Sequence, residues 1–309
     1  MALAPRRRRG TSTAATRPFP PGTYPVVVVG SGPGALQLSY FLTRLGIAHA
    51  VLSADDRPGG MFRNFPIYQR LNTWSKPYAP VAPDSRHYAW YDWNTLLADE
   101  PAHQARVPEF MRGDSYFPTR EEMEASLAAF VTRTGLAVRF GCRWEGTART
   151  EEGFVLRTSD GEYRCRVPVL AVGMAEPWKP AIAGIEHVPH YAEARPSEAY
   201  AGKRLLILGK RTSAFEIADA LLPFCREIIL VSPRPPLLSI HSHSTAGVRA
   251  RYLLPYEDHI LGGGVFMLDG ATSLIEPTAR GLRVTATGTT RPGNFVFDVD
   301  AVVAATGWT

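Results

Sequence analysis

The chain has 309 residues, of which 45% are hydrophobic and 20% are charged, a composition typical of a globular protein of about two domains. Its formal charge of +5 comes from residues 1–25, which hold five arginines and no acid, so the remainder balances 29 basic against 29 acidic residues. No basic face for nucleic acid is therefore expected outside this tail.

Residues 1–25 lack an apolar run, so neither a signal peptide nor a membrane anchor is expected there. We expect a disordered basic tail, with an arm that binds a polyanion as the alternative. The three cysteines (Cys142, Cys165 and Cys225) lie far apart, which argues against a disulfide framework and against a dithiol active site. The chain has no apolar stretch of about 18 residues that would predict a transmembrane helix. We expect a cytoplasmic protein without a membrane partner.

The first folded segment reads as a strand, a glycine-rich turn, a helix and a second strand. Val26–Val29 is apolar on both faces, as in a buried parallel strand. The turn Gly30-Ser31-Gly32-Pro33-Gly34-Ala35 follows at once, and apolar spacing predicts a helix over Leu36–Leu45 before a strand at Ala50–Leu52. This order indicates a dinucleotide site with the diphosphate at the helix N-terminus.

The acid that usually binds the ribose in such a fold is missing from its expected place. That residue normally ends the second strand, about 20 residues after the first glycine. Here the position is Ser53, and Asp55 and Asp56 lie just beyond it. We expect Asp55 to substitute less directly, so ribose binding is the weakest part of this prediction.

A second glycine pair, Gly59-Gly60, precedes Met61 and Phe62 in the loop at residues 57–66. The glycine turn, an acid-containing loop and this pair together resemble FAD-binding flavoproteins, including the flavin-containing monooxygenases. The resemblance implies that backbone at the glycine pair passes close to the diphosphate and ring of FAD. An ordinary Pro-Gly-Gly turn is the alternative.

The next segment, residues 68–94, is rich in aromatic residues and contains too many prolines for a regular helix. We expect its rings to line an active site, or else to fill a core that the loop covers. These rings are Tyr68, Trp74, Tyr78, Tyr88, Trp90, Tyr91 and Trp93.

Three runs, at residues 70–78, 91–97 and 115–120, resemble the FAD-dependent oxidoreductase domain-containing 2 family, an animal endoplasmic-reticulum flavoprotein with bacterial relatives. From the first run the resemblance implies polar groups near the flavin at Asn72, Ser75 and Lys76. Relatives tend to carry Asn where this chain has Ser75, and Asn72 is a candidate replacement.

The rest of the first half predicts a helix and several strands. Thr119 caps a helix over residues 120–134, and Gly135 ends it. Short strands are expected at residues 137–140, 154–158 and 163–166, and a buried strand at 167–173 carries Val172 in the threonine position of the family's A-T-G linker.

Prolines mark a linker over residues 176–202. His187 and His190 lie in it, but further ligands at suitable spacing are lacking, and the same holds for His241 and His243. No metal site is predicted.

A second strand-turn-helix unit begins at Lys203. Its strands are expected at residues 205–208 and 227–232, and its helix extends to Leu222. The turn Gly209-Lys-Arg-Thr-Ser-Ala214 resembles the NADPH-binding turn of these flavoproteins, with Thr212, Ser213 and Glu216 as matching positions. Arg234, after the second strand, is placed to meet a 2′-phosphate, or is a solvated loop arginine.

Arg211 stands where this turn normally has its second glycine. A β-carbon there obstructs the close approach of a diphosphate. The guanidinium could instead turn outward and bind phosphate. NADPH is therefore expected either to bind in a shifted pose or to bind poorly.

Residues 240–264 read as irregular, with a flexible hinge or lid at 262–264; strands follow at 282–286 and 295–297. Ala305-Thr306-Gly307 resembles the second A-T-G linker, which makes Thr306 and Gly307 cofactor-binding candidates. In related proteins the chain then returns to the FAD domain, whose C-terminal part is expected to be missing here.

The sequence thus predicts an α/β protein with two Rossmann-like three-layer domains and a small β-meander. The expected divisions are a tail (1–25), an FAD-binding domain (26–175), a linker (176–202) and an NAD(P)-binding domain (203–309). The resemblance implies an FAD-dependent, NADPH-using monooxygenase that oxygenates a small molecule with O₂ through a flavin C4a-(hydro)peroxide. A flavin reductase or oxidase releasing H₂O₂, and a cofactor-deficient scaffold, are the alternatives; a homodimer is left open.

Overall fold

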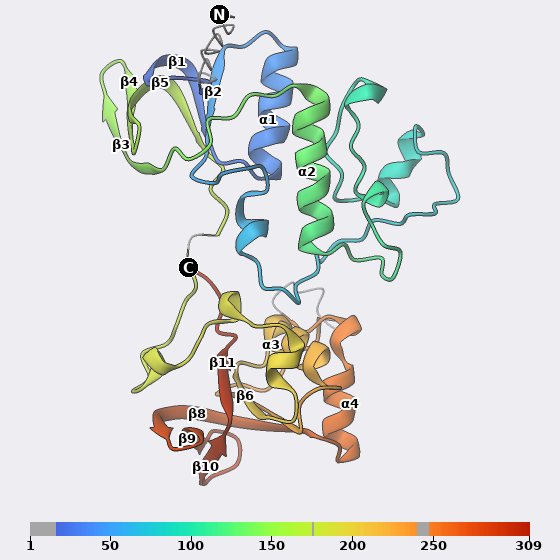
Figure 1. Ribbon diagram of the computed structural model, residues 1–309, viewed down its shortest axis with the longest axis vertical. Helices are drawn as coiled ribbons and strands as arrows, with labels where there is room; N and C mark the ends of the chain where they lie inside the picture. The colour runs from blue at the N-terminus through green and yellow to red at the C-terminus, as the bar shows by residue number, and fades with distance from the viewer. Residues whose placement is uncertain (1–16, 175, 240–246) are drawn as a thin grey trace, which may run out of the picture.

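The computed structural model describes residues 17–174, 176–239 and 247–309. They form two Rossmann-like α/β units, one above the other in Figure 1. The first contains β1 (Gly22–Val29), α1 (Pro33–Arg44), β2 (His49–Leu52), α2 (Arg120–Thr134), β3 (Trp144–Thr150), β4 (Gly153–Thr158) and β5 (Gly161–Leu170). The second contains β6 (Arg204–Leu208), α3 (Thr212–Leu221), β7 (Glu227–Ser232), α4 (Leu254–Leu261), β8 (Val265–Thr278), β9 (Gly281–Gly288), β10 (Asn294–Val299) and β11 (Ala301–Ala304).

The first sheet has the order β2-β1-β5-β4-β3. Strand β1 pairs in parallel with both neighbours, so that Val28 lies opposite Val51 on one side and Val169 on the other. Strand β5 also pairs antiparallel with β4, which joins the predicted β-meander to the parallel strands as one sheet. The three valines at 27–29 are buried, as expected for a strand covered on both faces.

Helix α2 has the bounds that its sequence predicts. The Thr119 side chain accepts a hydrogen bond from the backbone amide of Glu122 at 3.2 Å, and the Glu122 carboxylate accepts one from the amide of Thr119 at 2.8 Å. Gly135 ends the helix with φ +66°. This capping box and glycine stop satisfy backbone groups that the helix ends leave unpaired.

One strand prediction in the first unit is wrong, and another is right only over residues 167–170. Residues 137–140 make only an isolated parallel bridge between Arg139 and Leu52, whereas Trp144–Thr150 forms the unpredicted β3. The predicted buried strand at 167–173 is the end of β5, where Val167 and Leu170 are 50% and 48% exposed. They are exposed because β4 pairs with β5 only over residues 161–165 and leaves the outer edge beyond them uncovered.

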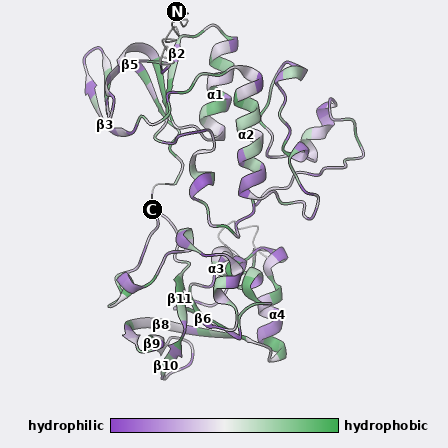
Figure 2. Ribbon diagram, in the orientation of Figure 1, coloured by the Kyte–Doolittle hydropathy of each residue, from purple (hydrophilic) through white to green (hydrophobic). Residues whose placement is uncertain are grey.

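The second sheet has the order β10-β9-β8-β7-β6-β11. Strand β8 pairs in parallel with β7 over residues 265–269 and antiparallel with β9 over 270–278. A long strand therefore connects parallel and antiparallel parts in this unit, as β5 does in the first. Hydrophobic residues concentrate in its parallel strands, as β6 and β11 in Figure 2 show, and residues 205–208 of β6 are buried.

The region predicted to be irregular before β8 contains α4, so this prediction is wrong for residues 254–261. Gly262 adopts φ +74° as the C-terminal cap of α4, and the Asp258 carboxylate accepts a hydrogen bond from the amide of Val265. Gly262 thus ends α4, and a hinge at residues 262–264 stays a prediction. Within the described ranges, every helix is too short or too polar to span a bilayer.

Specific contacts join the two units. The Arg251 guanidinium donates to the backbone carbonyls of Leu71 at 3.0 Å and Arg70 at 3.2 Å and stacks 4.2 Å from the ring centroid of Phe117. In the opposite direction, the Arg70 amide donates to the Glu216 carboxylate at 3.2 Å. The aromatic loop of the first unit is therefore held directly against α3 and its neighbours.

Candidate functional site

The first glycine turn begins with a residue that no other amino acid can replace without strain. Gly30 has φ +128°, and a β-carbon there would lie 2.3 Å from the carbonyl oxygen of Ala171. The amide of Gly30 also donates to the carbonyl of Leu52 at 2.7 Å. This turn is thus fixed between the ends of β2 and β5.

The N-terminus of α1 is open. Gly32 is its N-cap without a side-chain hydrogen bond, Pro33 occupies the first turn, and the first turn has no acid. A β-carbon at Gly32 or at Gly34 would meet nothing within 4 Å, whereas Ala35 is fully buried against the sheet. The free amides and the positive end of the helix dipole therefore suit a diphosphate.

Asp55 is brought to this turn by two buried serines. The hydroxyls of Ser31 and Ser53 each lie 3.1 Å from the Asp55 carboxylate and 2.9 Å from each other. Asp56 instead forms an ion pair with Arg63, which holds the pKa of Asp56 below its ordinary value. Asp55 is therefore the acid available at the cleft, with Ser53 as its support.

The glycine pair packs against the first turn. The amide of Gly59 donates to the carbonyl of Ser31 at 3.1 Å, and a β-carbon at Gly60 would lie 3.0 Å from the backbone of Gly32. A short 3₁₀ helix, Gly60–Asn64, continues from it and brings Met61 against Gly173. The close backbone approach explains why glycine is needed at residue 60.

These segments surround a cleft of about 710 Å³. Its walls come from the glycine turn, the Ser53–Asp55 segment, the glycine-pair loop and the segment after β5. Arg143 and Trp144 also line it, although the sequence offers no motif that identifies them. Predicted cofactor-binding residues in the walls are Gly30, Ser31, Gly32, Pro33, Gly34, Ser53, Asp55, Gly60, Met61 and Phe62.

The three polar residues expected near the flavin lie in different surroundings and do not form one site. Asn72 is exposed and lies 3.4 Å from the Arg251 guanidinium, whereas Ser75 is fully buried and donates to Asp92. Lys76 lines a different cavity of about 650 Å³ between the two units. None of the three lines the cleft at the first glycine turn.

Most aromatic rings of the 68–94 loop neither line that cleft nor fill a core. Trp74, Trp90 and Trp93 are 46%, 70% and 59% exposed, and the indole N–H groups of Trp74 and Trp93 both donate to the Trp90 carbonyl at 3.2 Å. Tyr88 is buried, and Tyr78 lines the cavity between the units. The three tryptophans therefore fill no core and do not line this cleft, and their expected place in an active site stays a prediction.

The second glycine turn repeats the geometry of the first. Gly209 has φ +138°, its amide donates to the Val231 carbonyl at 2.8 Å, and a β-carbon there would lie 2.6 Å from the Ala305 carbonyl. Helix α3 begins at Thr212 without a side-chain cap or an acid in its first turn. The backbone of this turn is thus suited to a phosphate.

The side chains around the second turn differ from those of the first. Lys210 is buried and ion-paired with Asp269, while Thr212 donates to the carbonyl of Gly247. Burial lowers the pKa of Lys210. Desolvation acts to raise the pKa of Asp269, but the hydrogen bonds that Asp269 accepts from Lys210 and Thr290 lower it below its ordinary value. The ammonium of Lys210 is therefore committed within the protein.

Arg211 is the N-cap of α3, and its Nη1 atom is buried without a hydrogen-bond partner among the described residues. A buried donor without a partner costs free energy, so an anion at this helix end would satisfy it. Ser213 lies in the first turn of the same helix, while Arg234 is exposed after β7.

Glu216 lies inside α3 rather than at its phosphate-facing end. Its carboxylate accepts hydrogen bonds from Tyr191 at 2.6 Å, from Tyr252 and from the amide of Arg70 at 3.2 Å. Burial raises the pKa of Glu216, although these bonds act to lower it. The residue therefore links the two units and the 176–202 segment.

Thr306 and Gly307 also bind protein groups. The Thr306 hydroxyl donates to the carbonyl of Trp178, and the Gly307 carbonyl accepts from the amide of Trp178 at 2.9 Å and lies 3.0 Å from His190 Nε2. His190 is thus a structural residue of this contact. His241 and His243 lie outside the described residues.

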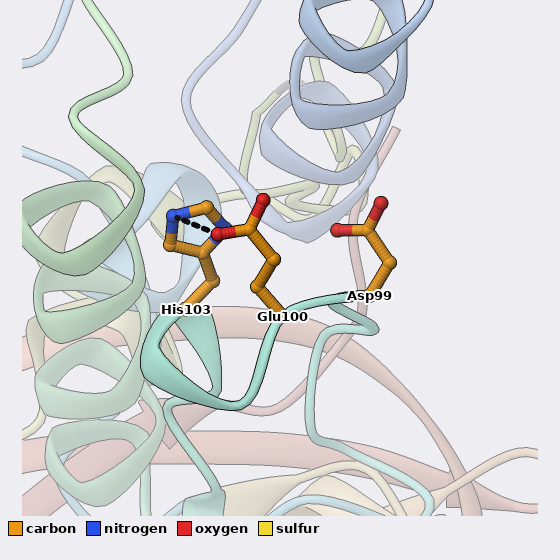
Figure 3. Close-up of side chains that lie close together, drawn as sticks. All are labelled: Asp99, Glu100 and His103. Atoms are coloured by element: carbon orange, nitrogen blue, oxygen red, sulfur yellow. Dashed lines mark ion pairs between the residues drawn. The ribbon is translucent and has the colours of Figure 1, made fainter.

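A further group of potential metal ligands was not recognised in the sequence. Asp99, Glu100 and His103 lie close together on one short segment, as Figure 3 shows. Arg44 makes ion pairs with Asp99 at 2.9 Å and Glu100 at 2.6 Å. The guanidinium already supplies the positive charge that these carboxylates require.

Comparison with known proteins places this geometry in context. Residues 27–309 match the family model described as pyridine nucleotide-disulphide oxidoreductase. FAD-dependent oxidoreductase domain-containing protein 2 of Mus musculus is 30% identical over 237 residues, which cover 72% of this chain and 34% of that protein. Indole-3-pyruvate monooxygenase YUCCA1 of Oryza sativa subsp. japonica is 27% identical over 210 residues, which cover 65% and 45%.

A solved structure, bacillithiol disulfide reductase Bdr from Bacillus cereus, matches with a TM-score of 0.70 at 19% identity, over 93% of this chain and 78% of that chain. This similarity shows a shared fold. The sequence matches confirm the predicted resemblance to the FAD-dependent oxidoreductase domain-containing 2 family. The chain spans between a third and a half of the length of these curated relatives.

Proposed function

We propose an FAD-dependent, NADPH-using monooxygenase, on the premise that the chain belongs to the pyridine nucleotide-disulphide oxidoreductase family. The observation that carries the proposal is the open glycine turn at the N-terminus of α1, with Asp55 beside it in a cleft of about 710 Å³. When bound there, FAD would pass electrons from NADPH to O₂, so that one oxygen atom enters a small-molecule substrate and the other leaves as water.

The residues of this cleft fit the diphosphate and a ribose of FAD. The first-turn amides of α1 are free of side-chain caps and would hold the diphosphate. Asp55 would accept hydrogen bonds from ribose hydroxyls, because Ser31 and Ser53 hold its carboxylate at the cleft wall. Gly60 would let the loop backbone lie against the diphosphate of FAD.

The second turn also suits a nicotinamide nucleotide, although Arg211 replaces its usual second glycine. The unsatisfied Nη1 of Arg211 favours its role as a phosphate ligand over that of an obstruction. Ser213 and the amides of α3 would add donors, and the exposed Arg234 would meet the 2′-phosphate of NADPH. Lys210 has no part in binding, because Asp269 holds it.

Two observations favour oxygenation over reduction of a disulfide. One relative that the sequence matches is a monooxygenase. The chain also has only three cysteines without a C-x-x-C pair, and Cys142 and Cys165 are buried. A disulfide reductase that uses its own dithiol is therefore unsupported. Of the polar groups assigned from the family resemblance, Asn72 and Lys76 remain candidates near the substrate, whereas Ser75 holds the loop together through Asp92.

The test is to purify the chain, identify any bound flavin, and measure NADPH consumed against H₂O₂ released with candidate amines and thioethers. Flavin binding followed by substrate-dependent loss of H₂O₂ release and formation of an oxygenated product supports the proposal. Complete release of H₂O₂ with every substrate would show an oxidase, and no flavin binding after reconstitution would show a scaffold.

A further inference from the structure

The cavity between the two units has a wall of opposite charges and aromatic rings. It measures about 650 Å³, and it shares no lining residue with the cleft at the first glycine turn. Lys76 and Tyr116 belong to the first unit, while Asp219 and Tyr252 belong to the second. This volume falls in the range of small-molecule sites, roughly 300–1,000 Å³.

The two arginines of this wall are already engaged. Arg70 pairs with Asp114 at 3.2 Å and donates to the Phe117 carbonyl at 3.0 Å. Arg251 donates to the carbonyls of Arg70 and Leu71. These contacts fix the shape of the cavity and engage the Nη atoms of Arg251, whose buried Nε has no hydrogen-bond partner among the described residues.

Asp219 and Lys76, which line the same cavity, have no such partners within the described ranges. In the described part of the chain, the Asp219 carboxylate has neither a hydrogen bond nor an ion pair, although it is half-buried at the cavity wall. The Lys76 ammonium likewise has no acidic partner there, and it lies 6.0 Å from the ring centroids of both Tyr91 and Tyr116. The cavity wall thus holds one carboxylate and one ammonium that have no ion-pair partner among the described residues, beside Arg251, whose guanidinium binds neutral carbonyls.

The position of Asp219 in its helix strengthens the demand for a cation. It lies in the last turn of α3, which ends at Leu221 and has no basic residue in that turn. The carboxylate and the negative end of the helix dipole therefore act together. Burial raises the pKa of Asp219, so holding its charge there costs stability when no cation is bound.

We infer that this cavity binds a small zwitterionic molecule, with its ammonium group on Asp219, its carboxylate on Lys76 and its apolar body between the tyrosines. Both charges of such a ligand would replace water at a partly buried group, and charge-assisted hydrogen bonds in such surroundings are strong. The aromatic walls provide apolar contact for the chain between the charges. The inference concerns binding alone and does not depend on flavin chemistry.

The experiment is isothermal titration calorimetry of the full chain with 6-aminohexanoate, with hexylamine and hexanoate as probes that carry one charge each. Homologues (4-aminobutyrate and 8-aminooctanoate) test the distance between the charges. The best zwitterion should bind at least about tenfold more tightly than either single-charge probe, the size of effect expected from one charge-assisted hydrogen bond.

The variants should then separate the two ends of the ligand. Asp219→Asn should weaken 6-aminohexanoate and hexylamine about tenfold and leave hexanoate unchanged; Lys76→Gln should weaken 6-aminohexanoate and hexanoate and leave hexylamine unchanged. Glu257→Gln, an exposed site on α4, and Lys203→Gln, outside the cavity, are the matched controls.

A folding defect is distinguished by thermal melting without ligand. Asp219→Asn removes a charge that has no partner, so its Tm should equal or exceed that of the wild type while ligand binding falls. Absence of binding by every zwitterion would overturn the inference. Equal weakening of all three hexyl probes in both variants would do the same, because it would show a structural effect.

Discussion

The carbonyl oxygen of Ala171 lies 2.3 Å from the point where a β-carbon on Gly30 would stand, and Ala305 stands in the same relation to Gly209 at 2.6 Å. In each unit, the backbone amide of this alanine donates a hydrogen bond to the carbonyl of the last residue of the first strand. Ala171 donates to Val29 at 2.8 Å, and Ala305 donates to Leu208 at 2.9 Å. The two units therefore close their glycine turns with the same strand contact, even though the later side chains of the turns differ.

The contact predicts a stability cost at the first glycine. Gly30→Ala would force a β-carbon onto the Ala171 carbonyl at a positive φ, so it should lower the free energy of unfolding by at least about 2 kcal/mol. Urea unfolding measures this change in the free energy of unfolding. Gly34→Ala, whose β-carbon would meet open space in the first turn of α1, is the control and should not destabilise the protein. An unchanged midpoint for Gly30→Ala would contradict the contact.

Asp55 is predicted to bind the ribose in place of the missing acid at Ser53. Asp55→Asn should raise the Kd for FAD about tenfold, because a charge-assisted hydrogen bond to a ribose hydroxyl becomes a neutral one. Fluorescence titration of the flavin-free chain provides the Kd. Asp56→Asn is the matched control, since the ion pair with Arg63 keeps that carboxylate engaged elsewhere; equal losses in both variants would reject the assignment.

Arg211 is predicted to be a phosphate ligand. Arg211→Gly should restore the usual glycine yet weaken NADPH binding about tenfold, because the guanidinium whose Nη1 lacks a protein partner is lost. Steady-state KM and direct titration give the result. Tighter binding by Arg211→Gly would show instead that the side chain obstructs the nucleotide. Arg234→Gln should weaken NADPH but not NADH, because NADH lacks the 2′-phosphate.

The Lys210–Asp269 pair is predicted to be costly to break. Asp269→Asn leaves the ammonium of Lys210, whose side chain is 1% exposed, without a counter-charge, so unfolding free energy should fall by about 2–3 kcal/mol. The control Asp298→Asn breaks an exposed pair with Arg283 and should leave the urea midpoint nearly unchanged. Similar midpoints for the two variants would contradict this difference in burial.

The Lys210–Asp269 pair also makes the free energy of unfolding depend on pH. The folded-state pKa of Asp269 lies below its ordinary value, so the stability that its charge contributes is present above the ordinary range and is lost as the pH falls through the folded-state pKa. Asp269→Asn should therefore lose less stability than the wild type during acid titration. Urea midpoints between neutral and acidic pH measure the difference, and parallel curves would contradict it.

Local patterns in the sequence determined the two strand-turn-helix units and helix α2. Four valines before Gly30, a capping threonine at 119 and a glycine at 135 act through neighbouring backbone groups, so their consequences can be predicted without knowing the fold. The same locality explains why strand β7 was predicted with its observed bounds.

Contacts between distant segments required the tertiary structure. Ser31 and Ser53 lie 22 residues apart in the chain, yet together they hold Asp55 at the cleft. Residues 137–140 look like a strand, but only Arg139 bridges to Leu52.

Asp219 and Lys76 face one cavity because α3 packs against a loop far away in the chain. Residue types and spacing fix which groups can form hydrogen bonds or bear charge, while the packing of the two units decides which of those groups remain without a partner.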